Sequence, residues 1–193
     1  MCEKMKTLIA YGTRYGATAE TAEEIAKVLR EESLGFDVKV INLKEEKVKD
    51  ISEYELVIVG SGLQMNKWTG EAEDFLKKFR KDLAQKKVAF FVSSAFIPLY
   101  RRQGKTAEVE QARKKYLEEK ASDCSLDPIA MEIFGGVLDF NKMGFLARKT
   151  FGWVKSSFEA ADYRETQPGV YDTRDLNVIK DWARKLILKA RYL

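Results

Sequence analysis

The sequence predicts an α/β fold in which a parallel sheet carries helices on both faces. Short apolar runs alternate with segments of helical periodicity along the 193 residues, which favours parallel strands joined by right-handed crossovers. The apolar run at 56–59, Leu-Val-Ile-Val, is continuous, as expected for a strand covered on both faces. Loops rich in Gly, Ser and Thr follow several of these runs. We therefore expect a small-molecule site outside the carboxyl ends of the strands.

The strands are predicted from runs of apolar and β-branched residues. The first run leads into Gly12 and the third ends in the turn Gly-Ser-Gly at 60–62. The five predicted strands occupy residues 6–12, 36–43, 55–61, 87–93 and 129–138.

The helices are predicted from apolar residues at helical spacing. In the first helix these residues lie at positions 22, 25, 26 and 29, and Gly35 follows its end. The charged stretch that contains Val48 and Ile51 allows a short helix. The other helices are predicted at 69–84 and 106–121 and at the C-terminal end, where core-facing positions run from Leu176 to Ala190.

The residue inventory excludes several kinds of catalysis. The chain has no histidine, so Ser-His-Asp and Cys-His hydrolases are excluded and the commonest transition-metal ligand is missing. Cys2 and Cys124 form neither a C-x-x-C pair nor a metal-ligand spacing, so we expect no disulfide and no metal site. A chain with this inventory is expected to borrow a cofactor for any chemistry it performs.

The charge balance and the N-terminal sequence set expectations about partners and location. The net charge is +4, from 34 Lys plus Arg against 30 Asp plus Glu, and no basic cluster is interleaved with aromatic residues. We therefore expect no nucleic-acid partner. The N-terminal sequence enters the first strand without an apolar signal region, and no stretch reaches the length of a membrane-spanning helix. These features predict a cytoplasmic protein.

The segment between the first strand and the first helix carries the main functional signal. It reads Gly12-Thr-Arg-Tyr-Gly-Ala-Thr18, and its hydroxyls and backbone N–H groups are suited to hold an anion at a helix N-terminus. Thr18 is expected to cap the helix. The loop lacks the Lys of a P-loop and does not match G-x-G-x-x-G. The alternative is an ordinary strand-to-helix turn with an N-cap threonine.

Three local features carry a resemblance to a known family. They are the pattern Thr13-x-x-Gly16-x-Thr18, the turn at 60–62, and the run Phe-Gly-Gly-Val-Leu at 134–138 with the basic aromatic segment after it. The chain resembles the flavodoxin superfamily over nearly its whole length and, within it, the short flavodoxin-like protoporphyrinogen IX dehydrogenases of the heme pathway. Tyr15 departs from the common flavodoxin loop, which has Thr there.

The resemblance implies an architecture and a cofactor. It implies one flavodoxin-like domain over residues 1–193, with three layers and a doubly wound sheet of five parallel strands in the order 2-1-3-4-5. It also implies FMN, held by the loops at 12–18, 60–69 and 93–104. The first loop would hold the phosphate and the second would lie along the flavin ring. The third would bring backbone amides to its pyrimidine end, under cover of Phe96 or Tyr100.

No catalytic side chain is assigned, because the flavin would carry the chemistry. Three alternatives are open for Arg14: it pairs with the phosphate, it covers the flavin edge, or it points into solvent. Trp68 either stacks on the ring or packs on the following helix. The residues expected to bind the cofactor are Thr13, Arg14, Tyr15, Gly16, Ala17, Thr18, Ser61, Gly62, Leu63, Gln64, Met65, Asn66, Trp68, Ser93, Ser94, Ala95, Phe96 and Tyr100.

Residues 139–171 form an insertion before the last helix that a minimal fold does not need. Apolar residues recur there at helical spacing with Lys and Arg beside them, which predicts a basic amphipathic helix over 142–158. Three interpretations stay open. The helix packs on the domain, or it contacts a membrane, a quinone or an acidic planar substrate such as a porphyrinogen, or it mediates homo-oligomer formation. The candidates for propionate contacts are Arg101, Arg102, Lys105, Arg148 and Lys149.

The leading functional hypothesis is an FMN-dependent oxidoreductase that resembles the quinone-dependent protoporphyrinogen IX dehydrogenases. Membrane association, if present, would be at the inner face. The alternative is a flavodoxin that shuttles electrons between redox proteins, although carriers of that family are strongly acidic and this chain is mildly basic. A domain that has lost its cofactor and an NAD(P)H-dependent quinone reductase are further alternatives.

Overall fold

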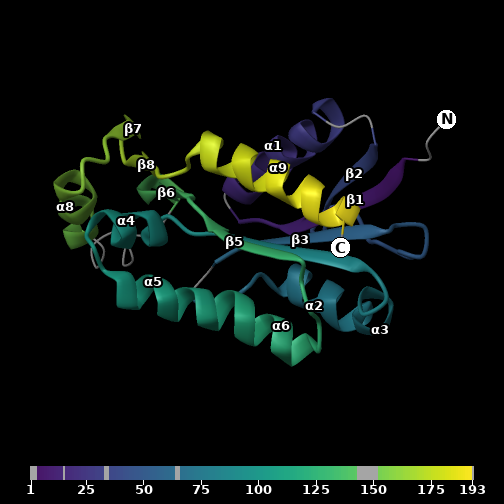
Figure 1. Cartoon of the computed structure of the whole chain (residues 1–193). Coiled ribbons are helices and arrows are strands. Elements are labelled where there is room, and N and C mark those ends of the chain that lie inside the picture. The colour runs from purple at the N-terminus through teal and green to yellow at the C-terminus, as the bar shows by residue number, and fades with distance from the viewer. Residues whose placement is uncertain (1–3, 15, 33–34, 64–65, 143–151, 193) are drawn as a thin grey trace.

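The main sheet has the predicted strands in the predicted order. A computed structural model describes residues 4–14, 16–32, 35–63, 66–142 and 152–192. Its five-stranded sheet has the order β2-β1-β3-β4-β5, and every neighbouring pair is parallel (Figure 1). The strands are β1 (Met5–Gly12), β2 (Phe36–Asn42), β3 (Leu56–Gly62), β4 (Lys87–Ser93) and β5 (Ala130–Phe134).

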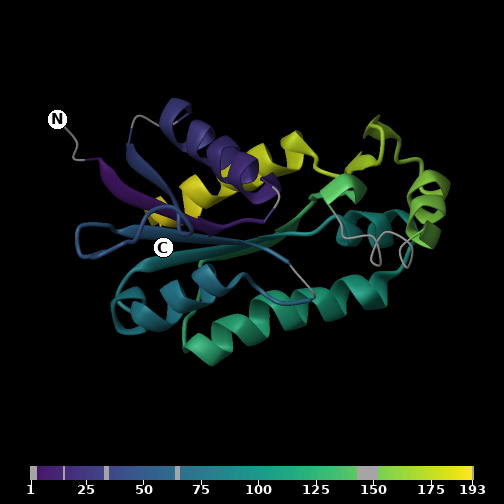
Figure 2. The same cartoon turned by 180° about the vertical axis from the view of Figure 1, so that it is seen from behind.

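Helices cover both faces of this sheet and give three layers, as predicted. One face carries α1 (Ala17–Glu31) and α9 (Leu176–Tyr192), and the other carries α2 (Gly70–Lys78), α3 (Arg80–Leu83), α5 (Thr106–Arg113) and α6 (Glu119–Cys124) (Figure 2). Successive residues of β4 point to opposite faces. Phe91 therefore packs with the α1 and α9 side, while Phe90 packs with the α2 and α5 side.

Several predicted helices differ from the observed ones. No helix forms around Val48 and Ile51, because residues 47–51 have no regular secondary structure and turns flank them. The predicted helix at 69–84 is divided into α2 and α3 at Phe79. A π-helical turn, η1 (Lys114–Glu118), joins α5 to α6. The segment expected to be a loop after β4 contains the helix α4 (Phe96–Arg102).

The predicted fifth strand is in fact two strands of different sheets. β5 ends at Phe134, and Gly135 and Gly136 lead into β6 (Val137–Asp139). A Cβ atom on Gly135 would lie 2.1 Å from the carbonyl oxygen of Thr173, so only glycine fits this crossing without movement of the backbone. β6 belongs to a small antiparallel sheet with the order β6-β8-β7, built with β7 (Glu165–Gln167) and β8 (Val170–Asp172).

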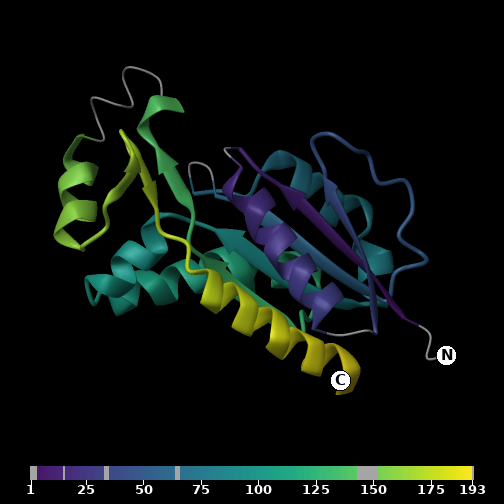
Figure 3. The same ribbon diagram turned by 90° about the horizontal axis from the view of Figure 1, so that it is seen from above.

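The small sheet, η2 (Phe140–Lys142) and α8 (Gly152–Ala160) make up the described part of the insertion. They lie beside α4, at the end of the main sheet away from both chain termini (Figure 3). Val154 and Phe158 of α8 are fully buried in an apolar cluster with Tyr171 of β8 and Leu99 of α4. The interpretation that the insertion helix packs on the domain is therefore confirmed for α8. The segment 143–151 lies outside the described residues.

Candidate functional site

Three loops meet where the strands of the main sheet end. The strand register places Gly12 beside Ser61, Gly62 beside Ser93, and Ser93 beside Phe134. We call this end of the sheet the carboxyl edge. In open parallel sheets, small-molecule ligands bind outside this edge.

The first loop forms a tight turn into α1. The hydroxyl of Thr13 accepts a hydrogen bond from the backbone N–H of Gly16 at 3.1 Å. Gly16 has φ 96° and is the N-cap residue, so α1 begins at Ala17. The prediction that Thr18 caps the helix is therefore wrong, because Thr18 already lies within the first turn. The backbone N–H groups of a first helical turn have no partner within the helix and are suited to an anion. Arg14 is exposed, and Tyr15 lies outside the described residues.

The second loop is fixed from within by a buried serine. The Ser61 hydroxyl accepts a hydrogen bond from the backbone N–H of Thr69 at 2.9 Å and donates one to the carbonyl of Gly62 at 3.0 Å. Its side chain thus holds the second loop in place, and the expectation that Ser61 binds a cofactor stays a prediction. Gly12 lies under Thr69, since a Cβ there would stand 1.9 Å from the Thr69 hydroxyl oxygen. Gln64 and Met65 lie outside the described residues.

Trp68 does not present a free ring at the carboxyl edge. Its side chain is 5% exposed and meets Phe90 edge-on at a centroid distance of 5.5 Å. The indole nitrogen donates a hydrogen bond to the carbonyl of Tyr116 at 2.9 Å. Of the two alternatives for Trp68, packing against the following helix is therefore the one observed, because the indole belongs to the core that also contains Ala72 and Phe75 of α2. Leu63 also packs against this core, while Asn66 has φ 60° at the turn between them.

Among the described residues, the hydroxyl of Ser93 is the one buried polar side-chain group without a hydrogen-bond partner. Its hydroxyl oxygen is inaccessible, and the residue is 6% exposed. Ser93 pairs with Gly62, and a Cβ on Gly62 would lie 3.1 Å from the Thr18 hydroxyl oxygen. Because paired residues of neighbouring strands point to the same face, the Ser93 side chain is on the face that carries the first turn of α1.

The rest of the third loop is used to hold α4 and the insertion. The backbone N–H of Ser94 donates to the carbonyl of Phe134 at 3.0 Å, so this amide is not free for a flavin, contrary to expectation. Ala95 is buried in the cluster that joins α4 to the insertion. Phe96 meets Phe158 edge-on at 5.9 Å, while Tyr100 is partly buried against the core of the α2 side.

Two arginines of α4 that were candidates for propionate contacts have partners within the chain. Arg101 forms an ion pair with Glu132 at 3.1 Å. The Arg102 guanidinium lies 3.9 Å from the centre of the Tyr163 ring and donates a 2.9 Å hydrogen bond to the carbonyl of Ala161. Arg102 thus fastens the insertion to α4. Lys105 is exposed, and Arg148 and Lys149 lie outside the described residues.

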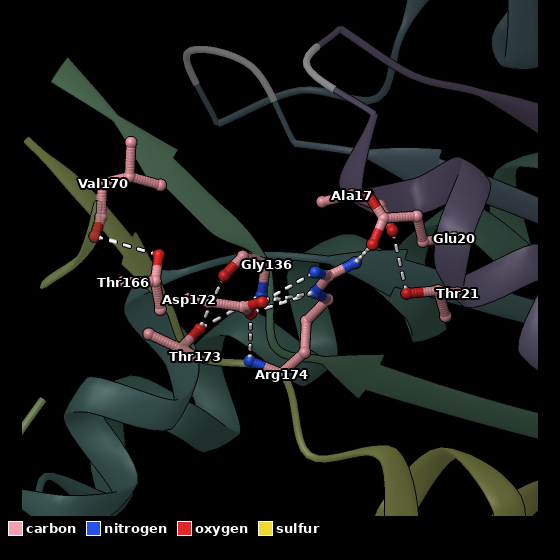
Figure 4. Close-up of polar contacts among 9 residues, drawn as sticks. All are labelled: Ala17, Glu20, Thr21, Gly136, Thr166, Val170, Asp172, Thr173 and Arg174. Atoms are coloured by element: carbon pink, nitrogen blue, oxygen red, sulfur yellow. Dashed lines mark hydrogen bonds and ion pairs between the residues drawn. The ribbon is translucent and has the colours of Figure 1, made fainter. Parts of the chain in front are cut away.

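A cluster that the sequence interpretation missed joins the small sheet to α1. Arg174 donates to both carboxylate oxygens of Asp172, with Nη2 at 2.6 Å from Oδ2, and its Nη1 lies 2.5 Å from the Glu20 carboxylate (Figure 4). The neighbouring Thr173 hydroxyl accepts from the N–H of Gly136 at 3.1 Å and lies 3.0 Å from its carbonyl oxygen. The sequence offered one signal, an Asp-x-Arg spacing directly before the last helix.

The charges of this cluster are held in place by their mutual contacts. Burial opposes ionisation of Asp172, but the hydrogen bonds from the Arg174 side chain and backbone outweigh it and lower the pKa of this carboxyl. Hydrogen bonds to Asp172 and Glu20 raise the pKa of Arg174 further above its usual range. Both groups therefore stay charged at neutral pH.

Within the described residues, no group of three or more His, Cys, Asp or Glu is placed to hold a metal ion. Over the same residues, no helix has both the length and the apolar character needed to cross a membrane.

Comparison with known proteins identifies the family. The Flavodoxin domain model matches residues 8–164, so the chain belongs to the flavodoxin domain family. It is similar to the Escherichia coli (strain K12) protein named protoporphyrinogen IX dehydrogenase (quinone), with 31% identity over 87 residues, which are 45% of this chain and 47% of the relative. The chain thus spans about half the length of the curated relatives it matches.

Solved structures show the same fold over greater lengths. A flavodoxin from the domain Archaea has a TM-score of 0.53 at 18% identity and covers 97% of this chain and 100% of its own. The two-electron reduced flavodoxin of Megasphaera elsdenii has a TM-score of 0.51 at 19% identity and covers 80% of this chain and 97% of its own. At these identities the likeness concerns the fold.

Proposed function

We propose that this protein binds FMN at the carboxyl edge and works as an oxidoreductase of the protoporphyrinogen dehydrogenase type. The observation that carries the cofactor assignment is the buried Ser93 hydroxyl without a partner, on the face of the sheet where α1 begins. A buried polar group is normally hydrogen-bonded, so an orphan hydroxyl at a ligand edge fits a bound group that supplies its partner. Membership of the flavodoxin domain family supports FMN as that group.

The chain's residues divide the work of holding the cofactor. The first turn of α1, with the backbone N–H groups of Ala17 and Thr18, would hold the phosphate, and Thr13 keeps the preceding loop in the required turn. The second loop, fixed by Ser61 and anchored by Trp68, would border the flavin ring. FMN would supply the two-electron redox chemistry, which the chain's own side chains do not provide.

The substrate class rests on the relatives and on charge. Proteins that match 45% of the chain bear the name protoporphyrinogen IX dehydrogenase (quinone), and the net charge of +4 suits a substrate with carboxylates. Each turnover would remove a pair of hydrogens from the porphyrinogen. A quinone would take up these two hydrogens and become a quinol, so that oxidation and reduction balance.

The test begins with the visible spectrum of the purified protein titrated with FMN. The flavin-loaded protein is then mixed anaerobically with protoporphyrinogen IX, and menadione is added as acceptor. Free FMN at the same concentration and the protein without FMN are the controls. Porphyrin formation well above both controls is expected. Failure to bind FMN contradicts the cofactor assignment. Binding without porphyrin formation contradicts the substrate assignment and favours a carrier that serves a redox partner protein.

A further inference from the structure

Arg174 links the insertion to the turn that begins α1. It follows β8 directly, holds Asp172 of that strand through a two-pronged contact, and reaches Glu20 in the first turn of α1 (Figure 4). The Arg174 side chain is 13% exposed, whereas the Glu20 side chain is 68% exposed. The arginine is therefore the fixed member of the pair.

The position of Glu20 gives this contact an electrostatic consequence. A carboxylate in the first turn of a helix interacts favourably with the helix dipole, but it opposes a second anion bound at the same N-terminus. The phosphate of FMN would be such a second anion at the N-terminus of α1. The guanidinium of Arg174 neutralises Glu20 and also holds its side chain at a fixed place beside the turn.

We propose that Arg174 is a positioning residue for the phosphate end of the cofactor site, acting through Glu20, and that the insertion thereby sets the affinity for phosphate. This inference rests on the proposed FMN binding. It does not require Arg174 to touch the cofactor, because both ends of its guanidinium already have carboxylate partners.

The chain offers a matched control at the other end of the same helix. Arg184 of α9 holds Glu32, the residue that follows α1, through two hydrogen bonds of 2.7 Å, and also contacts Asp181 at 2.8 Å. Each arginine thus contacts one carboxylate at an end of α1 and one carboxylate close to itself in the C-terminal part of the chain. A helix rises about 1.5 Å per residue, so Glu32 lies near the opposite end of α1 from the candidate phosphate site.

The experiment compares the dissociation constants of FMN and of riboflavin, which lacks the phosphate, for each variant. R174Q is expected to weaken FMN binding about fivefold, within the roughly twofold to thirtyfold range of charge effects at helix termini, with riboflavin binding unchanged. E20Q, which leaves the Arg174–Asp172 contact in place, is expected to tighten FMN binding and to leave riboflavin binding unchanged. R184Q should leave both dissociation constants, and therefore their ratio, unchanged.

The outcomes separate this inference from the proposed function. If the unaltered protein does not bind FMN, the proposed function fails and this inference falls with it. If the unaltered protein binds FMN but R174Q and E20Q leave the ratio of the two constants unchanged, the inference alone is overturned. Equal weakening of FMN and riboflavin binding by R174Q would show a general structural role and would also overturn it. E20Q keeps the inference testable should R174Q fail to fold.

Discussion

The indole nitrogen of Trp68 donates a hydrogen bond to the carbonyl oxygen of Tyr116 at 2.9 Å, and Tyr116 lies in the π-helical turn η1. The wider turn of a π-helix disturbs the regular pattern of carbonyl partners, and such turns are frequent near functional sites. Here the turn offers a carbonyl to the loop that precedes α2. The second loop of the candidate site is thus hydrogen-bonded to the helical segment α5–η1–α6, which lies on the same face of the sheet as α2.

Replacing Trp68 with Phe should measure how much the hydrogen bond to Tyr116 contributes to stability. The phenyl ring can keep the contact with Phe90, but the buried carbonyl of Tyr116 loses its donor, so we expect a loss of about 1–2 kcal/mol in the free energy of unfolding. W182F is the matched control. Trp182 is also buried against a phenylalanine, Phe134, and the described residues give its indole nitrogen no hydrogen-bond partner. Urea unfolding in which W68F costs no more than W182F would contradict the interpretation.

A second prediction concerns the crossing of the chain at Gly135. In G135A the new Cβ would stand 2.1 Å from the carbonyl oxygen of Thr173, a backbone atom that can move only with the segment before α9. We expect a loss of about 2–4 kcal/mol in the free energy of unfolding, as for other overpacked or strained sites. G70A is the control, because a Cβ on Gly70 meets no atom within 4 Å at the start of α2. Thermal unfolding should show G70A unchanged or more stable, and similar midpoints for both variants would refute the argument.

The main sheet was predictable because its signals are local. Each strand of that sheet is a run of at least five residues whose apolar character can be read from the sequence, and the family resemblance then gave the strand order. The small sheet was missed because its strands have three residues each, too few to show a period, and β7 is wholly exposed. Helix α4 was missed because the whole segment 93–104 was interpreted as a loop, although Pro98 does not exclude a helix there, since the first turn of a helix tolerates proline.

The candidate site was predictable in part for a related reason. Thr13 and Gly16 could be identified as one turn because they lie close together in sequence. Arg174 and Glu20 are 154 positions apart, so no spacing in the sequence indicates their contact. The burial of Trp68 likewise depends on Tyr116, which is 48 positions away. Side-chain roles that depend on such distant partners require the structure.

A third prediction follows from Tyr171, which is fully buried with its hydroxyl 3.2 Å from Glu159 and 3.4 Å from Glu165. Burial and the two carboxylates raise its pKa to about 12, from an ordinary value of 10.0. Between these two pH values the unfolded chain loses the phenolic proton while the folded chain keeps it. Stability from this group is therefore fully present below pH 10 and falls as the pH rises toward 12.

The measurement is the free energy of unfolding in urea at pH 9 and at a pH near 11. We expect Y171F to lose about 1–2 kcal/mol less over this interval than the unaltered protein, because the substituted side chain has no proton to release. Y192F is the control, since Tyr192 is 80% exposed. An identical pH dependence in Y171F and the unaltered protein would show that other groups control the alkaline transition.

The last prediction contrasts two buried serines at neighbouring strand ends. Ser61 is fully hydrogen-bonded, so S61A leaves the N–H of Thr69 without its partner and should cost about 1–3 kcal/mol of stability in the protein without cofactor. Ser93 has no partner among the described residues, so S93A removes an unpaired buried hydroxyl and should stabilise the same protein by about 1 kcal/mol. If that hydroxyl forms a hydrogen bond with FMN, S93A should also weaken FMN binding about fivefold, which corresponds to the free energy of about one hydrogen bond. Higher stability with weaker binding is a combination that damage to the fold cannot produce. Unchanged FMN affinity in S93A would remove Ser93 from the cofactor site.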